Sequence, residues 1–222
     1  MRYDAVVIGG GRSGCAEALR RAAEGQKVCV VSAGLTLHSL EPELKDKPYA
    51  LLHELTKAGI AVLRGDTAAE ALWMAGDGVA SERHATLGNV RGGDPSKMGG
   101  MSSGAANRVG GNSLHGQLAV SAVLTANGIT LEAAEFVLAT GRFFSRGLIA
   151  DMEGVREPLF GADVDFPADR SKWFDPDFFA PQPFEGFGVK TDKKGRILKG
   201  GKAVENVFAI GKILGGKHNA GK

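Results

Sequence analysis

The chain has 222 residues, a formal net charge of +2 and 33 glycines. This length allows one domain with a small insert, and the near balance of charges argues against a dedicated nucleic-acid binder. Two cysteines without metal-ligand spacing exclude a disulfide framework and fit a reducing compartment. Because the sequence has no secretion signal and no apolar run of the roughly 18–20 residues that a membrane span needs, we expect a cytoplasmic protein without a membrane span of its own.

The first 34 residues predict a β-strand, an α-helix and a second β-strand. Residues 5–8 form a short apolar run that is typical of a buried parallel strand. A glycine turn follows, residues 13–24 have helical composition, and Gly25 is well placed to end the helix. Residues 27–32 predict the second buried strand, which completes a βαβ unit with parallel strands.

The middle of the chain gives weaker signals. Residues 48–58 predict a helix that ends at Gly59, and residues 60–63 predict a third short strand. Residues 67–75 again have helical composition. The stretch 88–116 is rich in glycine and poor in large apolar side chains, so we interpret it as an irregular loop.

The second half predicts more strands and an irregular layer. Residues 118–124 and 129–131 flank an Asn-Gly step, which strongly favours a β-hairpin. Buried strands are expected at 135–138 and 206–211. Residues 143–190 hold many aromatic side chains without helical periodicity, and we expect them to form an inserted irregular layer over one edge of the sheet.

Three of the predicted strands run into a glycine, namely Gly9, Gly141 and Gly211. In a doubly wound sheet, ligands bind beyond the carboxyl ends of the parallel strands. The three glycines are therefore expected at one binding edge. The residues between 9 and 14 match the pattern G-x-G-x-x-G after a strand and before a helix, which is the context that gives the motif its meaning.

Each glycine of the motif has a physical role. Gly9 permits the tight turn, Gly11 leaves room for a phosphate, and Gly14 lets helix and strand pack closely. Free N–H groups in the first helical turn and the helix dipole favour an anion there. The prediction is a single α/β domain over 1–222 with a Rossmann-like FAD/NAD(P)-binding three-layer fold.

One element of a dinucleotide site is missing. Such sites place Asp or Glu about 20 residues after the motif to bind the ribose hydroxyls, whereas this chain has Ser32 and Ala33 there. Two explanations remain open. Either the ligand is a mononucleotide such as FMN, which we favour, or FAD is held through backbone contacts and Ser32. Selective use of NAD is disfavoured.

The sequence also resembles a known family. The resemblance rests on the opening MRYDAVVIGGGRSG and on three later stretches. These stretches are FVLATGRFFSRGLIADMEGVREPLFGADVD, SKWFDPDFFAPQPFEGFGVKTD and ENVFAIGKILGG. They are similar to the B subunit of anaerobic glycerol-3-phosphate dehydrogenase, a flavoprotein of the FAD-dependent oxidoreductase and fumarate reductase-like superfamily. Residues 35–117 do not match clearly, and the chain is shorter than the family in its middle and at its C-terminus.

The resemblance implies an activity and partners. Glycerol 3-phosphate would be oxidised to dihydroxyacetone phosphate, in glycerol metabolism and anaerobic respiration. Hydride would pass to a flavin while a base takes the hydroxyl proton. An A-like subunit and an iron–sulfur C-like subunit would link the chain to quinone, so that it lies peripherally at the inner membrane through a partner. The family is associated with FMN, which agrees with the missing acid.

The sequence departs from this superfamily after its last strand. Lys212 follows Gly211, where relatives commonly carry an acid that bonds the ribityl chain. A lysine there would instead neutralise a flavin or substrate phosphate, or would simply be solvated. Relatives also continue into a helix whose N-terminus faces the flavin ring, so the flavin site of this chain is either incomplete or completed by another chain.

The candidate cofactor residues gather around the glycine motif and the ends of the predicted strands. They are Gly9, Gly10, Gly11, Arg12, Ser13, Gly14, Ser32, Ala33, Thr140, Gly141, Gly211 and Lys212.

Other candidate residues carry weaker signals. Arg142 and Arg146 would either meet phosphate or be solvated, and Phe143 and Phe144 would either pack in the core or wall a flavin ring. The five histidines lack metal-ligand spacing, so no metal site is expected, and none stands out as a catalytic base.

Two other functions compete with the flavin-dependent dehydrogenase. One is a non-catalytic assembly protein with a degenerate flavin fold. Its motivation is Lys212, the glycine-rich middle and the missing helix. The other is a stand-alone FAD/NAD(P)-dependent reductase.

Overall fold

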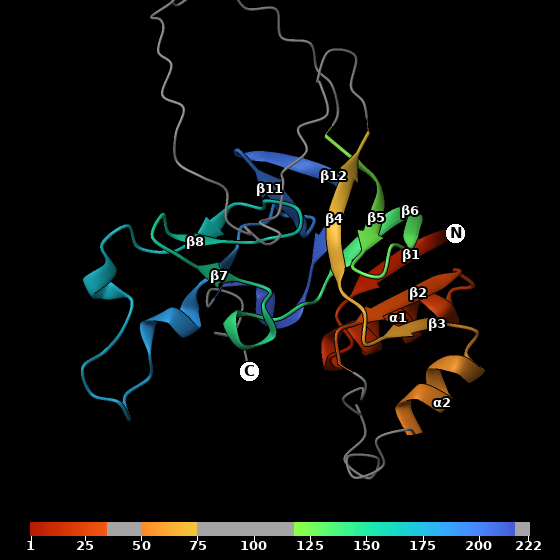
Figure 1. Ribbon diagram of the computed structural model, residues 1–222, viewed down its shortest axis with the longest axis horizontal. Helices are drawn as coiled ribbons and strands as arrows, with labels where there is room; N and C mark the ends of the chain where they lie inside the picture. The colour runs from red at the N-terminus through yellow and green to blue at the C-terminus, as the bar shows by residue number, and fades with distance from the viewer. Residues whose placement is uncertain (35–49, 75–117, 216–222) are drawn as a thin grey trace, which may run out of the picture. The chain divides into compact units, whose positions relative to one another are not determined.

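A parallel sheet forms the centre of the fold in the computed structural model, which describes residues 1–34, 50–74 and 118–215 (Figure 1). The strands of its main path follow the order β11-β12-β6-β1-β2-β3. All neighbours along it are parallel except β11 and β12, which are antiparallel. Their bounds are β1 Arg2–Ile8, β2 Val28–Ser32, β3 Ala61–Arg64, β6 Thr130–Leu138, β11 Arg196–Lys199 and β12 Lys202–Ala209.

The predicted βαβ unit is confirmed. Helix α1 spans Arg12–Ala23 between β1 and β2. It ends in a Schellman motif, because Gly25 adopts a φ of +83° and the N–H of Gln26 donates to the carbonyl of Arg21 at 3.1 Å. Helix α2, Ala50–Lys57, ends in the same way at Gly59 and leads into β3.

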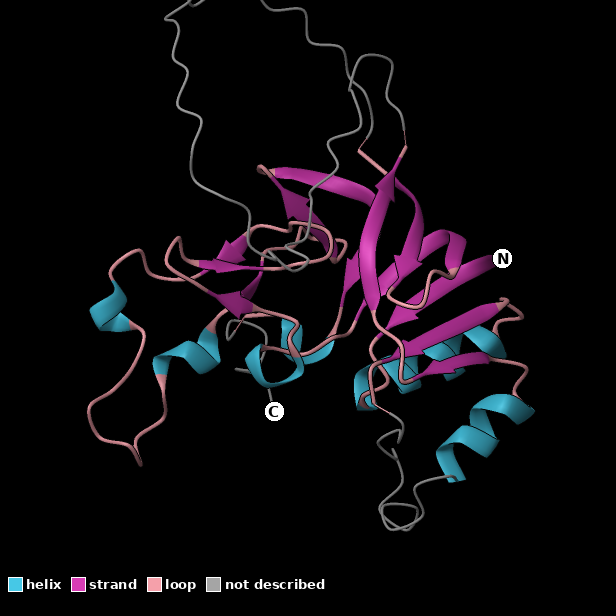
Figure 2. Ribbon diagram, in the orientation of Figure 1, coloured by secondary structure: helices cyan, strands magenta, loops and turns pink. Residues whose placement is uncertain are grey.

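The two faces of the sheet carry different layers. Alternate residues of β1 point to opposite faces. Ala5 and Val7 are buried against α1 and α2, while Val6 and Ile8 pack in the cluster that includes the segments after β6. Figure 2 shows both helices on one side of the strands. The three-layer Rossmann-like α/β prediction is therefore confirmed.

The prediction of a helix at 67–75 is wrong. Residues Ala68–Trp73 form strand β4, which pairs antiparallel with β5, Val120–Thr125. The alanines and glutamate favour a helix locally, but β5 pairs with Ala68 and with residues 70–73, with register shifts within the pairing. Long-range pairing therefore overrides local propensity.

The predicted hairpin is confirmed, with one change. Strand β5 pairs antiparallel with β6 around Asn127 and Gly128, whose φ is +82°. The predicted strands at 129–131 and 135–138 are one continuous strand, β6. Its first half pairs with β5 and its second half with β12, so one strand joins the hairpin to the parallel sheet.

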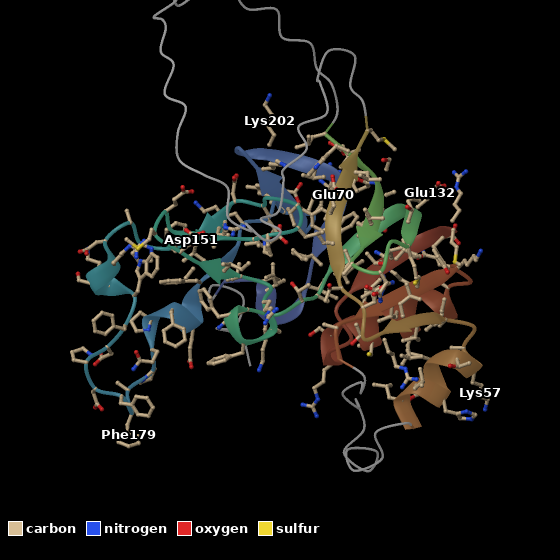
Figure 3. The ribbon with its side chains drawn as sticks, in the orientation of Figure 1. Lys57, Glu70, Glu132, Asp151, Phe179 and Lys202 are labelled. Atoms are coloured by element: carbon tan, nitrogen blue, oxygen red, sulfur yellow. The ribbon has the colours of Figure 1, made fainter. Side chains whose placement is uncertain are left out.

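The segment after β6 consists of short elements. Its strands are β7 Ile149–Ala150, β8 Val155–Arg156, β9 Val164–Asp165 and β10 Gly188–Val189, with 3-10 helices η2 Phe143–Ser145, η3 Arg170–Lys172 and η4 Pro183–Gly186. Aromatic rings at Phe143, Phe166, Trp173, Phe184 and Phe187 pack edge-on or tilted against one another. Figure 3 places Phe179 at the end of a loop that extends away from the sheet.

The glycine-rich stretch 88–116 lies outside the described residues. Of the helices in the described ranges, none has the length and apolar character to cross a membrane.

Candidate flavin-binding site

The three strand-ending glycines lie at one edge of the sheet. The last residues of the strands are in register, with Ile8 opposite both Val31 and Leu138, and Leu138 opposite Ala209. Gly9, Gly141 and Gly211 lie just beyond these strand ends, and their φ angles are +121°, +75° and +72°. An L side chain is strained in this region of φ, so glycine lets all three strands turn at the same edge.

The glycine motif has the geometry that its sequence predicts. A Cβ at Gly9 would lie 2.3 Å from the carbonyl oxygen of Ala139, and one at Gly14 would lie 2.0 Å from that of Gly9. A Cβ at Gly11 would meet nothing within 4 Å. The first and third glycines therefore serve close packing. The middle one leaves open space at the N-terminus of α1, where a helix favours a phosphate.

A cavity of about 780 Å³ opens at this edge. Its size lies within the range of small-molecule sites. Ten of the predicted cofactor residues line it, namely Gly9, Gly10, Gly11, Arg12, Ser13, Ser32, Ala33, Thr140, Gly141 and Lys212. Two predicted residues, Gly14 and Gly211, do not line it. Gly14 packs under the turn, and a Cβ at Gly211 would lie 2.4 Å from Ser13 Oγ.

Two buried oxygens of the lining, Asp66 Oδ2 and Thr140 Oγ1, have no hydrogen-bond partner among the described residues, and the second belongs to a hydroxyl. Buried polar atoms without a partner are uncommon and call for an explanation. Its place in the cavity wall makes this hydroxyl available to a polar group of a bound molecule. The open space at Gly11 and the Thr140 hydroxyl together fit a nucleotide.

Asp66 also lines the cavity, although it was not singled out from the sequence. Only 4% of its surface is exposed, and its backbone N–H donates to the carbonyl of Ser32 at 3.2 Å. Its Oδ1 accepts from the N–H groups of Thr67 and Asn127 at 2.8 and 3.2 Å. Burial works to raise its pKa, but hydrogen bonds from Thr125, Thr67 and Asn127 bring the pKa below its ordinary value. Misassigning 67–75 as a helix hid this residue, because Asp66 precedes a strand at the binding edge.

Glu157 is a second buried carboxyl of the lining that sequence reasoning missed. It accepts hydrogen bonds from the backbone N–H groups of Leu159, Phe160 and Ala162 at 2.8–3.3 Å. Burial raises its pKa, and these hydrogen bonds offset only part of the rise. Because both carboxylate oxygens are engaged, Glu157 acts to shape the loop that places Leu159 in the cavity wall.

The turn after β6 holds the weaker candidates of residues 142–146, and their side chains lie in different surroundings. Arg142 donates to the carbonyls of Lys212 and Leu214 at 2.7 and 3.5 Å, which ties this turn to the 3-10 helix η5, Gly211–Ile213. Phe143 packs with other aromatic rings and Phe144 is 97% exposed. None of these three lines the cavity, whereas Arg146 does.

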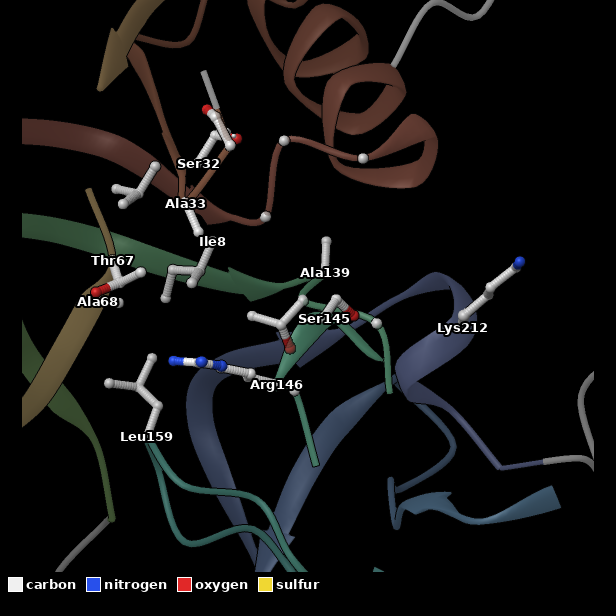
Figure 4. Close-up of a pocket in the computed structure, with 18 of the residues that line it drawn as sticks. Ile8, Ser32, Ala33, Thr67, Ala68, Ala139, Ser145, Arg146, Leu159 and Lys212 are labelled. Atoms are coloured by element: carbon white, nitrogen blue, oxygen red, sulfur yellow. Dashed lines mark hydrogen bonds between the residues drawn. The ribbon is translucent and has the colours of Figure 1, made fainter. Parts of the chain in front are cut away.

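The structure also shows where the candidate Lys212 points and which of the histidines it describes. Figure 4 shows the Lys212 side chain pointing away from Arg146 and from the wall at Thr67 and Ala68. His53 is exposed on α2, and the other four histidines lie outside the described residues. Within the described ranges, no group of His, Cys, Asp or Glu side chains has the arrangement of a metal site.

The sheet, the glycine turn and the cavity beyond the strand ends together define a Rossmann-like nucleotide-binding protein. The chain belongs to the FAD binding domain family, whose model matches residues 61–221. A flavin is therefore the cofactor class of this fold and site. The match begins after the glycine turn, so it is independent of the motif described above.

Curated relatives support the resemblance seen in the sequence. The B subunit of the anaerobic glycerol-3-phosphate dehydrogenase of Yersinia enterocolitica is 41% identical over 120 residues, which cover 49% of this chain and 28% of that protein. The protein of the same name from Yersinia pseudotuberculosis is 49% identical over 88 residues, covering 40% and 21%. The matched segments thus span about a quarter of the length of these relatives.

Among solved structures, the chain is similar to a geranylgeranyl bacteriochlorophyll reductase-like protein from Thermoplasma acidophilum. The two are 14% identical, with a TM-score of 0.38, over 63% of this chain and 39% of that one.

Proposed function

We propose that this chain is the flavin-binding part of a quinone-linked glycerol-3-phosphate dehydrogenase and corresponds to the B subunit of that enzyme. The observation that carries the proposal is the open space at Gly11, at the N-terminus of α1 and inside the cavity. The names of the curated relatives support the choice of substrate. In this proposal residues 1–222 form one flavin-binding domain, with 143–190 as an inserted layer.

The proposed reaction converts glycerol 3-phosphate into dihydroxyacetone phosphate. A bound flavin would supply an acceptor for the hydride of the carbinol carbon. The backbone N–H groups in the first turn of α1 hold the phosphoryl end of the cofactor, and Thr140 Oγ1 offers it a hydrogen bond. Glu157 is not proposed as the base for the hydroxyl proton, because its oxygens already accept backbone hydrogen bonds.

The proposal also includes partners. Electrons would leave through an iron–sulfur C-like subunit to quinone, and an A-like subunit would join the complex, because the names of the relatives describe one component of a larger enzyme. The chain would then lie on the cytoplasmic face of the inner membrane and bind it through a partner. Either FMN or FAD satisfies this scheme. The missing acid favours FMN, while the family description points to FAD.

Reconstitution tests the proposal. The purified protein is mixed with FMN and FAD, freed of excess flavin and examined by visible absorbance, and the retained cofactor is released by denaturation and identified by mass. The proposal predicts about one flavin per chain, bleached by glycerol 3-phosphate when the partner subunits are present.

The other outcomes identify the competing functions. A protein that stays colourless after reconstitution contradicts the proposal and supports an assembly protein that has lost the cofactor. A yellow protein that oxidises NADH or NADPH without partners supports a stand-alone reductase instead.

A further inference from the structure

The loop between the 3-10 helices η3 and η4 carries phenylalanine side chains in solvent. In this aromatic loop, residues 174–182, Phe178 and Phe179 are 86% and 93% exposed, and Phe174 is 58% exposed. The rings of Phe178 and Phe179 pack edge-on, with their centroids 5.5 Å apart. Figure 3 shows Phe179 at the end of the loop, away from the sheet. Single apolar side chains in water need no explanation, but a cluster of them is typical of an interaction surface.

The aromatic loop is fixed to the core at both ends. Trp173 precedes it and packs edge-on against Phe166 and Phe187, with centroid distances of 5.8 Å. The indole N–H of Trp173 also donates to the carbonyl of Pro167 at 2.7 Å. Phe184 follows the loop, and its backbone N–H donates to the carbonyl of Trp173 at 3.0 Å. The loop therefore projects from a firmly packed base.

Side chains within the aromatic loop hold its backbone in one conformation. The side-chain oxygen of Gln182 accepts from the N–H of Asp175 at 2.9 Å. Its amide nitrogen donates to the carbonyls of Asp177 and Ala180 at 3.0 and 3.2 Å. The carboxylates of Asp175 and Asp177 each accept from the N–H two residues further along, at 2.9 and 3.0 Å. A loop that is ordered before it binds loses less entropy when a partner covers it.

The charges around the exposed rings indicate what kind of surface covers them. Residues 173–189 include three acidic side chains, Asp175, Asp177 and Glu185, and no lysine or arginine. All three acidic residues are exposed. A membrane surface is anionic and attracts basic segments, so it would repel this loop. Two copies of the loop packed on each other would bring like charges together, which opposes that contact. The loop therefore suits a protein surface with an apolar pocket and a basic border.

We propose that the aromatic loop docks this chain on another subunit of the enzyme, in an apolar pocket bordered by lysine and arginine side chains. Phe178 and Phe179 fill the pocket, because large aromatic side chains contribute most to such interfaces. Asp175 and Asp177 face the basic border, which orients the chain and speeds association. The inference rests on the proposed function, which makes the chain one component of a larger enzyme, and it names the surface that joins the chain to that enzyme.

Surface plasmon resonance of the flavin-loaded chain on the immobilised A-like and iron–sulfur subunits tests the inference. The double variant Phe178→Ala with Phe179→Ala should bind at least about thirtyfold more weakly than the wild type. Its thermal midpoint should not fall, because both rings are already exposed in the free protein. Phe144→Ala removes a ring that is 97% exposed outside the loop, and it should bind within about twofold of the wild type.

A second variant tests the charges separately from the rings. Asp175→Asn with Asp177→Asn keeps the side-chain oxygens that accept from the loop backbone but removes both charges. At low salt this variant should associate more slowly than the wild type, and its association rate should depend less on the salt concentration. A rate and a salt dependence equal to those of the wild type would refute the basic border of the pocket.

Each other result overturns the inference. If the double phenylalanine variant binds the subunits as tightly as the wild type, the docking surface lies elsewhere and the proposed function stands. Equal losses in the double variant and in Phe144→Ala would show that the aromatic loop has no special part in docking. Wild-type protein that retains flavin but binds neither subunit refutes the proposed partners together with the inference, and failure to retain flavin refutes the flavin function.

Two further measurements identify a different occupant of the aromatic loop. Flotation with vesicles of phosphatidylcholine and phosphatidylglycerol would assign the loop to a membrane if the wild type binds them and the double phenylalanine variant does not. Analytical ultracentrifugation would assign it to a second copy of this chain if the wild type sediments as a dimer and the double variant as a monomer. Either result contradicts docking on another subunit through this loop.

Discussion

At the scale of single residues, the glycine motif shows how far sequence reasoning reaches. The roles of Gly9, Gly11 and Gly14 follow from their spacing, and the structure gives each the predicted surroundings. The sequence could not reveal Arg146 as the residue directed into the cavity, because a left-handed backbone at a non-glycine residue has no sequence signal. It also could not separate Arg142 from Arg146, since the path of an irregular turn decides where each side chain points.

The first prediction concerns the packing of α1 on β1. Replacing Gly14 with alanine places a Cβ 2.0 Å from the carbonyl oxygen of Gly9, a backbone atom that cannot move aside without shifting the turn. We expect Gly14→Ala to lower the free energy of unfolding by about 3 kcal/mol. Urea unfolding followed by circular dichroism measures this. A loss below about 1 kcal/mol would mean that the helix lies farther from the strand.

At the scale of elements, α1 is fastened to the sheet by a buried arginine. Arg21 is 6% exposed and lies within 2.7 Å of both Glu17 on its own helix and Glu135 on β6. The adjacent Arg20 binds Glu17 and Glu24 on the surface of the same helix. Of these two arginines only Arg21 links two elements, so it contributes to the orientation of the helix whose N-terminus faces the cavity.

The second prediction compares the two neighbours. Arg21→Ala should destabilise the fold by about 2–3 kcal/mol, because it removes the shared partner of two carboxylates that lie partly out of water. Arg20→Ala should leave the urea midpoint nearly unchanged, since exposed ion pairs contribute little. Urea unfolding of both variants is the measurement. Equal effects would show that the link between α1 and β6 does not carry stability.

Strand β4 shows why some elements could not be predicted. Its residues, Ala68–Trp73, have helical composition, and their pairing with β5 depends on a partner about 50 residues away in the chain. The βαβ unit, by contrast, is determined by local patterns that agree with its tertiary contacts. Of the cavity lining, sequence reasoning singled out residues of the βαβ unit together with Thr140, Gly141 and Lys212. It missed Asp66, whose place in the lining depends on β4 and the hairpin.

At the scale of the whole molecule, several carboxyls connect stability to pH. Hydrogen bonds from Arg20 and Arg21 lower the pKa of Glu17, and those from Thr125, Thr67 and Asn127 lower that of Asp66 despite its burial. Each group binds fewer protons in the folded state than in the unfolded state. Its contribution is therefore present above its ordinary pKa, 4.5 for Glu17 and 3.8 for Asp66, and is lost as the pH falls through its folded pKa.

The third prediction follows from this sign. The urea midpoint should fall as the pH is lowered below 4.5, and Asp66→Asn should make the decline shallower because one linked carboxyl is gone. Glu157 has the opposite effect on stability, because burial raises its pKa. Its contribution is present below its ordinary pKa of 4.5 and is lost as the pH rises through its folded pKa. Urea titrations at a series of pH values measure the slope. An Asp66→Asn slope equal to that of the wild type would contradict the role given to Asp66.

The fourth prediction tests most directly the claim that the N-terminus of α1 holds the phosphate of a flavin. Gly11 has a φ of −81°, and a Cβ there meets nothing within 4 Å, so Gly11→Val should fold normally and differ only by filling the open space. Calorimetric titration with flavin should show binding about a hundredfold weaker than for wild type, with unchanged circular dichroism. A folded Gly11→Val protein that binds flavin as tightly as the wild type would contradict the account.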